Sequence, residues 1–280
     1  MIDFEDLAEL DRQYDIAIAV PDIQRTASKL LEEGKRLRED NAAYREFFYG
    51  GDELQNLDYF PASTSSPLLV YIHGGYWHRF DKSFFSNVGQ AWNAVGVSVA
   101  VINYRLAPIA SMGVIVDDVR RAIVWLWKNA EKLDFDATNI VLAGSSAGGH
   151  LTAMMLATEW SLVDSSLPSN LVKGGVSISG LHDLSPFLRA PFLKDVIGLT
   201  PDDVDQYSPA GLLPPTNVPV ITCVGGDESP AFHAQNRLLA ERWPINHKLD
   251  VLAPATNHVT VNALLVDPAS DLFRATQSLF

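Results

Sequence analysis

One serine of this chain lies where a side-chain alcohol can become a nucleophile. Residues Gly144–Gly148 read G-S-S-A-G, a G-x-S-x-G pentapeptide, directly after the apolar run Ile140–Ala143. A strand that turns sharply and continues as a helix from Ala147 lifts Ser146 clear of the sheet, and the flanking glycines relieve crowding in that turn. The lysine of a phosphate-binding Walker loop is absent. We therefore predict that Ser146 is a catalytic nucleophile, which requires a base and an oxyanion site elsewhere.

The second candidate feature is a pair of glycines that can supply the oxyanion site. The sequence H-G-G-Y-W, with Gly74 and Gly75 at its centre, follows the apolar run Leu68–Ile72. Acyl transfer places negative charge on the former carbonyl oxygen, which backbone N–H groups stabilise when they already point at it. The N–H groups of Gly74 and Gly75, together with that of Ala147, are predicted to form this oxyanion hole.

The general base of such a reaction is a histidine, and the chain has seven. His258 follows the last predicted strand through a loop that contains Pro254 and Asn257. A loop at the carboxyl end of a parallel strand delivers its side chain to the same edge of the sheet as Ser146, so His258 is the predicted base. The other six are His73, His78, His150, His182, His233 and His247.

An acid is needed to orient the histidine ring and to stabilise its charged form. Two adjacent carboxylates, Asp227 and Glu228, follow the apolar run Val218–Val224. Aspartate is the commoner residue in this role, whereas the spacing from Gly225 favours Glu228. We predict Glu228 as the acid and keep Asp227 as the alternative.

The elements that must position these residues alternate along the chain, which predicts an α/β fold with a mainly parallel sheet and helices on both faces. The predicted strands are Gln55–Phe60, Leu68–Ile72, Val97–Ile102, Ile140–Ala143, Val176–Ser179, Val218–Val224 and Leu249–Leu252. The predicted helices are Asp22–Asn41, Lys82–Val95, Val114–Lys132, Ala147–Thr158, Ala231–Trp243 and Val259–Leu265.

The chain is predicted to form a single domain over residues 1–280, with two additions to the alternating core. Residues 1–50 are expected to form an N-terminal helical segment. Residues 181–217 hold most of a proline-rich stretch and are expected to form a small cap, because long insertions in compact α/β domains are often lids. The predicted substrate-binding residues are Tyr76, Trp77, His182 and Phe187, with core packing as an equal alternative for Phe187.

Composition limits the partners that the protein can have. The formal net charge is −13, which makes nucleic acids and anionic membranes poor partners. The single cysteine, Cys223, excludes an intrachain disulfide and a thiolate metal cluster, and no H-E-x-x-H motif or dinucleotide-binding glycine motif occurs. We predict no metal and no cofactor. The acidic N-terminus and the lack of a long apolar run predict a cytoplasmic protein.

Several motifs taken together resemble a known group of enzymes. The motifs are H-G-G-Y-W at His73–Trp77, N-Y-R-L-A-P at Asn103–Pro108, G-S-S-A-G-G-H-L at Gly144–Leu151 and the acidic loop Val224–His233. They are similar to those of the α/β-hydrolase fold, within it to hormone-sensitive-lipase-like esterases, and most of all to kynurenine formamidase (arylformamidase) and its bacterial esterase relatives. The resemblance runs from about Leu10 to His258 and implies a triad in the order Ser146, Glu228, His258.

The resemblance leaves two substrate classes open. Formamidases commonly have a histidine before the nucleophile, where this chain has Ser145. We predict a serine hydrolase of small or aromatic carboxylic esters, with an arylformamidase acting on N-formyl-L-kynurenine or a related formamide as the alternative. A non-catalytic ligand receptor on a hydrolase scaffold is a remote third interpretation, because such proteins usually lose the catalytic histidine. A homodimer paired through edge strands or the N-terminal helix is a further hypothesis.

Overall fold

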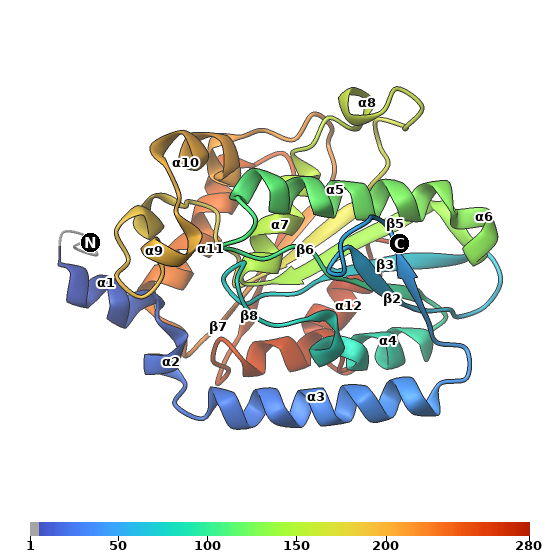
Figure 1. Cartoon of the computed structure of the whole chain (residues 1–280), viewed down its shortest axis with the longest axis horizontal. Coiled ribbons are helices and arrows are strands. Elements are labelled where there is room, and N and C mark those ends of the chain that lie inside the picture. The colour runs from blue at the N-terminus through green and yellow to red at the C-terminus, as the bar shows by residue number, and fades with distance from the viewer. Residues whose placement is uncertain (1–5) are drawn as a thin grey trace.

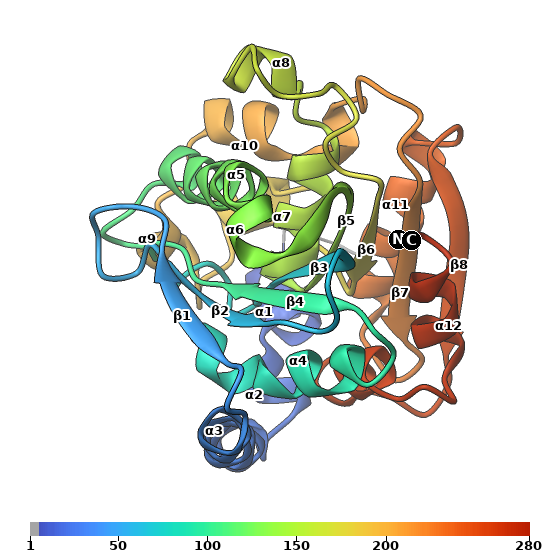
Figure 2. The ribbon, with the colours of Figure 1, turned by 90° about the vertical axis from the view of Figure 1, so that its right-hand side faces the viewer.

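The computed structural model describes residues 6–280, which form one eight-stranded sheet with helices on both faces (Figures 1 and 2). The strand order is β1-β2-β4-β3-β5-β6-β7-β8. The β1–β2 and β2–β4 pairs are antiparallel, and every later pair is parallel. The predicted α/β layering and mainly parallel sheet are therefore confirmed. Residues 1–5 of the predicted N-terminal segment lie outside the described residues.

The strands in the described chain agree with the predicted apolar runs, with one addition. They are β1 (Arg45–Phe48), β2 (Asn56–Phe60), β3 (Ser66–Ile72), β4 (Ser98–Ile102), β5 (Phe135–Ser145), β6 (Gly174–Ile178), β7 (Val220–Gly225) and β8 (His247–Ala253). The prediction that residues 1–50 are helical is wrong for β1, which lies within that segment. Its sequence R-E-F-F is too short and too polar to stand out, and pairing with β2 stabilises it as an edge strand.

The α-helices are α1 (Leu7–Tyr14), α2 (Ile16–Ala19), α3 (Ile23–Asp40), α4 (Ser86–Asn93), α5 (Met112–Lys128), α6 (Ala130–Leu133), α7 (Ala147–Leu156), α8 (Trp160–Val163), α9 (Lys194–Ile197), α10 (Pro201–Tyr207), α11 (Pro230–Arg242) and α12 (Asp271–Gln277). Four 3-10 helices accompany them, η1 (Lys82–Phe85), η2 (Ser185–Leu188), η3 (Pro209–Gly211) and η4 (Thr260–Leu265). The last predicted helix, Val259–Leu265, is thus a 3-10 helix, and helix α12 beyond it was not predicted.

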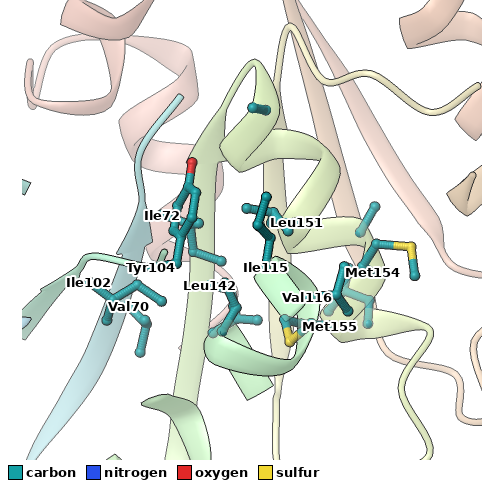
Figure 3. Close-up of a cluster of buried hydrophobic side chains, with 14 of the residues drawn as sticks. Val70, Ile72, Ile102, Tyr104, Ile115, Val116, Leu142, Leu151, Met154 and Met155 are labelled. Carbon is teal, nitrogen blue, oxygen red and sulfur yellow. The ribbon is translucent and has the colours of Figure 1, made fainter. Parts of the chain in front are cut away.

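Buried strand β3 divides the core into two layers because successive side chains point to opposite faces of a sheet. Leu68, Val70 and Ile72 belong to one cluster, with side chains of α5, α7 and α11. Leu69 and Tyr71 belong to the other, with side chains of α4 and α12. Figure 3 shows the first layer, where Val70, Ile72, Ile102 and Leu142 meet residues of α5 and α7.

Residues 181–217 form short helices with no strand, as the many prolines predict. They comprise η2, α9, α10 and η3 between strands β6 and β7. Helix α10 contacts α5, and Figure 1 shows α9 and α10 at the side of the molecule where α1 lies. Helix α10 approaches α5 closely, because a Cβ on Gly113 would lie 2.6 Å from the Tyr207 hydroxyl.

No helix in residues 6–280 is long and apolar enough to span a membrane.

An ion pair between the buried Asp118 and the partly exposed Arg105 holds the N-Y-R-L-A-P loop against α5. The Asp118 carboxylate is fully buried and accepts hydrogen bonds from the Arg105 backbone N–H and guanidinium and from Gln55 Nε2. We predict that Asp118→Asn lowers the free energy of unfolding by about 2–4 kcal/mol, because one amide N–H then faces these donors and Arg105 loses its counterion.

Urea unfolding of this variant beside Asp117→Asn measures the effect. Asp117 is the neighbouring residue, its side chain is 58% exposed, and its pair with Arg120 lies on the surface. Its substitution should change the free energy by less than about 1 kcal/mol. Equal losses in the two variants would contradict the prediction.

Candidate active site

Ser146 lies in a strained turn between strand β5 and helix α7. Its φ of 57° and ψ of −118° are unusual for a residue with a side chain. The turn needs glycine at Gly144 and Gly148, because a Cβ there would lie 2.2 Å from the Gly148 carbonyl oxygen and 1.9 Å from that of Ile72, respectively. The Ser146 N–H donates to the carbonyl of Ile178 on β6, at 2.8 Å. This is the strand–turn–helix geometry expected for a nucleophile elbow.

His258 and Glu228 form a buried pair. His258 Nδ1 lies 2.6 Å from Glu228 Oε2, and since a carboxylate only accepts hydrogen bonds, Nδ1 carries the proton. This tautomer leaves Nε2 as the acceptor, which is the form a general base needs. The Phe232 ring packs on the His258 ring at 4.3 Å between centroids and limits its rotation.

The other Glu228 oxygen, Oε1, accepts hydrogen bonds from Ser179 Oγ at 2.5 Å and from the Gly225 N–H at 2.7 Å. Burial alone raises the pKa of the Glu228 carboxyl, but the His258 ring and these hydrogen bonds outweigh burial and lower it. Asp227, the alternative acid, is exposed. The structure therefore brings Glu228, and not Asp227, to His258.

A chain of contacts connects this pair to the elbow. Ser146 binds Ile178 through its N–H, and Ser179, the next residue, binds Glu228 through its hydroxyl. Ser179 was not singled out in the sequence, although its place at the end of a predicted parallel strand was a usable signal. Its φ of 49° marks a second strained position on this edge of the sheet.

The three predicted oxyanion donors lie around the elbow. A Cβ on Gly74 would lie 2.7 Å from the Ser145 carbonyl oxygen and 3.2 Å from Ser146 Cβ, so only glycine allows this approach. Within residues 6–280, the N–H groups of Gly74, Gly75 and Ala147 donate no hydrogen bond to another protein atom. These amides are therefore available to an oxyanion.

Tyr76 and Trp77 both have positive φ angles, 49° and 58°, and each is anchored through its polar atom. The Tyr76 hydroxyl donates to the Tyr14 carbonyl at 2.5 Å. Trp77 Nε1 donates to Nδ1 of His150 at 3.1 Å, and His150 Nε2 in turn lies 2.7 Å from the Tyr207 carbonyl. Burial lowers the pKa of His150 to about 3, so the ring is neutral and can accept from Trp77.

The structure corrects the predicted roles of Trp77, His182 and Phe187 as substrate contacts, because all three are fully buried. The His182 ring has a partner on both nitrogens, Ser177 Oγ at Nε2 and the Gln235 carbonyl at Nδ1. Phe187 packs against Trp77 and Tyr76 with centroids 6.0 and 5.8 Å apart. These side chains support the walls of the site, and the core alternative for Phe187 is the one the structure favours.

His73 and His247 have partners of their own in the structure. His73 is buried, stacks on Tyr104 at 4.4 Å, and has its Nδ1 2.8 Å from the Gly74 carbonyl, so it organises the glycine loop. His247 lies on strand β8 and forms a hydrogen bond with Thr222.

In residues 6–280 no group of three or more His, Cys, Asp or Glu side chains could hold a metal ion.

Comparison with known proteins identifies the family to which the chain belongs. The BD-FAE family model matches residues 58–196. Kynurenine formamidase of Salmo salar is 30% identical over 276 residues, which cover 92% of this chain and 91% of that protein. The chain belongs to the kynurenine formamidase family.

Two further similarities agree with this assignment. The crystal structure of a putative thioesterase from Silicibacter sp. TM1040 superposes with a TM-score of 0.83 at 30% identity, covering 96% of this chain and 99% of that one. Carboxylesterase NlhH of Mycobacterium tuberculosis is 38% identical over 91 residues, which are 32% of this chain and 28% of that protein. The family has the α/β-hydrolase fold, and the protein is a hydrolase of the esterase and arylformamidase group.

The lowered pKa of Glu228 predicts a pH dependence of stability. An unfolded glutamate titrates near about pH 4.3, so the contribution of Glu228 is complete above that pH and is lost as the pH falls through its lower pKa in the folded protein. As the pH falls from about 5 to about 3, the free energy of unfolding of the wild type should therefore decrease relative to that of Glu228→Gln.

Denaturant titrations at several pH values measure this difference. Asp227→Asn is the matched control, because Asp227 is adjacent and exposed. A difference between wild type and Glu228→Gln that stays constant with pH would show that Glu228 has the same pKa in the folded and unfolded chains.

Proposed function

We propose that the protein hydrolyses carboxylic esters of small or aromatic substrates through an acyl-enzyme on Ser146. The observation that carries the proposal is the buried Glu228–His258 hydrogen bond of 2.6 Å, at the edge of the sheet where the Ser146 elbow lies. A strained serine, a histidine base oriented by a carboxylate, and free amides are the components that acyl transfer requires. The similarity to a kynurenine formamidase and to a putative thioesterase, each over more than nine-tenths of both chains, supports the same chemistry.

In the proposed mechanism, His258 Nε2 takes the proton of the Ser146 hydroxyl as Ser146 Oγ attacks the substrate carbonyl. The resulting oxyanion accepts hydrogen bonds from the N–H groups of Gly74, Gly75 and Ala147. Glu228 remains ionised and stabilises the charged ring. His258 then protonates the leaving alcohol, and the ester bond breaks.

Water completes the reaction by the reverse route. His258 removes a proton from water, the hydroxide attacks the acyl carbonyl, and Ser146 Oγ leaves and regains its proton from His258. The products are a carboxylic acid and free enzyme. No metal or cofactor enters any step of the proposal.

A second candidate is hydrolysis of an aryl formamide such as N-formyl-L-kynurenine. It is favoured by the similarity to a kynurenine formamidase over 91% of that protein, whereas the carboxylesterase NlhH matches over only 28% of its length. The same site serves both reactions, with an aryl amine as the leaving group in place of an alcohol.

We further propose that the protein is cytoplasmic and forms a homodimer.

Substitution of the nucleophile tests the mechanism. Ser146→Ala should lower kcat for p-nitrophenyl acetate by about 10⁴-fold or more, because removing a triad member leaves only binding and the oxyanion site. A fluorophosphonate probe should label the wild type and not the variant. Full hydrolysis by Ser146→Ala would overturn the proposal.

The acid is tested by neighbouring substitutions. Glu228→Gln should lower kcat by about 10³- to 10⁴-fold, since the ring loses its orienting carboxylate. Asp227→Asn should leave kcat within about twofold of wild type, because the exposed Asp227 side chain has no place in the proposed mechanism. The reverse pattern would assign the acid to Asp227.

Substrate class is decided by kcat/KM for N-formylkynurenine and for short-chain aryl esters on the same enzyme. An ester hydrolase should favour the esters, and a formamidase should favour the formamide by a large factor. The Ser146→Ala variant serves as the blank for both substrates.

A further inference from the structure

Helix α1 contacts three parts of the molecule that are far apart in sequence. It packs against α11, which follows the acid loop. Its Tyr14 carbonyl accepts the Tyr76 hydroxyl of the glycine loop, and its Asp11 carboxylate lies 3.5 Å from the Phe192 N–H of the cap segment. Figure 1 shows α1 at the same end of the molecule as α9 and α11.

Gln13 makes two hydrogen bonds to the start of α11 and is the acceptor in both. The first N–H groups of a helix have no partner within it and need an outside acceptor. Ser229 holds the N-cap position of α11 but makes no capping hydrogen bond with its side chain. Gln13 Oε1 instead accepts the Ala231 N–H at 3.0 Å, and the Ser229 hydroxyl donates to the Gln13 carbonyl at 2.5 Å. Gln13 thus caps α11 from a distant part of the chain.

The capped residues lie between Glu228 and Phe232, which both contact the ring of His258. Glu228 directly precedes Ser229, and Phe232 directly follows Ala231. The Glu228 carboxylate binds His258, and the Phe232 ring packs on the ring of His258. A shift of residues 229–231 would therefore move both the Glu228 carboxylate and the Phe232 ring that limits rotation of His258.

Tyr14 extends the contact to the glycine loop. Its ring packs edge-on against Phe187 at 5.0 Å and Phe232 at 5.6 Å, and its hydroxyl accepts from Gln235 Nε2 at 3.1 Å. Its carbonyl binds Tyr76, which directly follows the proposed donor Gly75. Two adjacent residues of α1 thus contact both halves of the proposed site.

We propose that Gln13 is a positioning residue for the Glu228–His258 pair, acting through the N-terminus of α11. The proposal rests on the proposed function. Gln13 does not touch the pair. It holds residues 229–231, and through them it sets the distance and orientation of the Glu228 carboxylate and the Phe232 ring.

The test compares Gln13→Met with Arg12→Met. Methionine keeps the length of the side chain and removes the acceptor for Ala231. Arg12 lies on the same helix, is 55% exposed and pairs with Asp6 and Glu9. Gln13→Met should lower kcat by about 10- to 100-fold with KM within about twofold, since misplacing a catalytic group by about 1 Å costs about 100-fold. Arg12→Met should keep both constants.

A double variant separates positioning from loss of folding. Gln13 Nε2 donates to Glu9 Oε1 at 2.6 Å, so exchanging the two, as Glu9→Gln/Gln13→Glu, keeps this contact and restores an acceptor to Ala231. Its kcat should recover to within about threefold of wild type. Gln13→Met with unchanged kcat, or a double variant with no recovery although its melting temperature matches wild type, would overturn the proposal.

A separate measurement tests the proposed function. Fluorophosphonate labelling of Ser146 in wild type reports the catalytic serine independently of any change in α1. If wild type is labelled and hydrolyses esters while Gln13→Met is unaffected, only the positioning role fails. If wild type is not labelled, both proposals fail.

Discussion

The site depends on a main-chain contact between helix α7 and the end of strand β3. A Cβ on Gly148 would lie 1.9 Å from the Ile72 carbonyl oxygen, so no side chain can separate the two backbones. Because Gly74 follows β3 after His73 and α7 begins at Ala147, this contact brings the glycine loop beside the turn that holds Ser146. Hydrophobic packing of α7 on the sheet supplies the energy that holds the backbones together (Figure 3).

A buried carboxylate imposes the second requirement, because an ion removed from water must be compensated by partners. Glu228 obtains them from three neighbouring parts of the sheet: Ser179 after β6, the Gly225 N–H at the end of β7, and His258 after β8. Parallel pairing places the carboxyl ends of these strands side by side. The strand order is thus what allows an ionised acid to lie in the interior beside the base.

Strain accompanies this arrangement. Tyr76, Trp77, Ser146 and Ser179 all have positive φ angles, and each such position costs about 1–3 kcal/mol. Hydrogen bonds at or beside these residues hold the conformations, and several come from segments outside the sheet, including Tyr14 of α1 and the Tyr207 carbonyl of α10 through His150. Helices α1 and α10 therefore help to maintain the shape of the glycine loop.

The sequence alone determined what depends on local patterns. Continuous apolar runs predicted the central strands, because a strand buried on both faces needs apolar residues throughout. The glycines around Ser146 and at Gly74 predicted the tight turn and the oxyanion site, because close backbone contact tolerates no side chain. Only the tertiary structure decided between Asp227 and Glu228, since adjacent side chains point in opposite directions and burial beside His258 is a long-range property. It also decided that His182, Phe187 and Trp77 are buried supports, and that Gln13 reaches α11 across 218 residues. Such contacts leave no periodic signal in the chain, because they depend on how separate elements pack and not on their spacing.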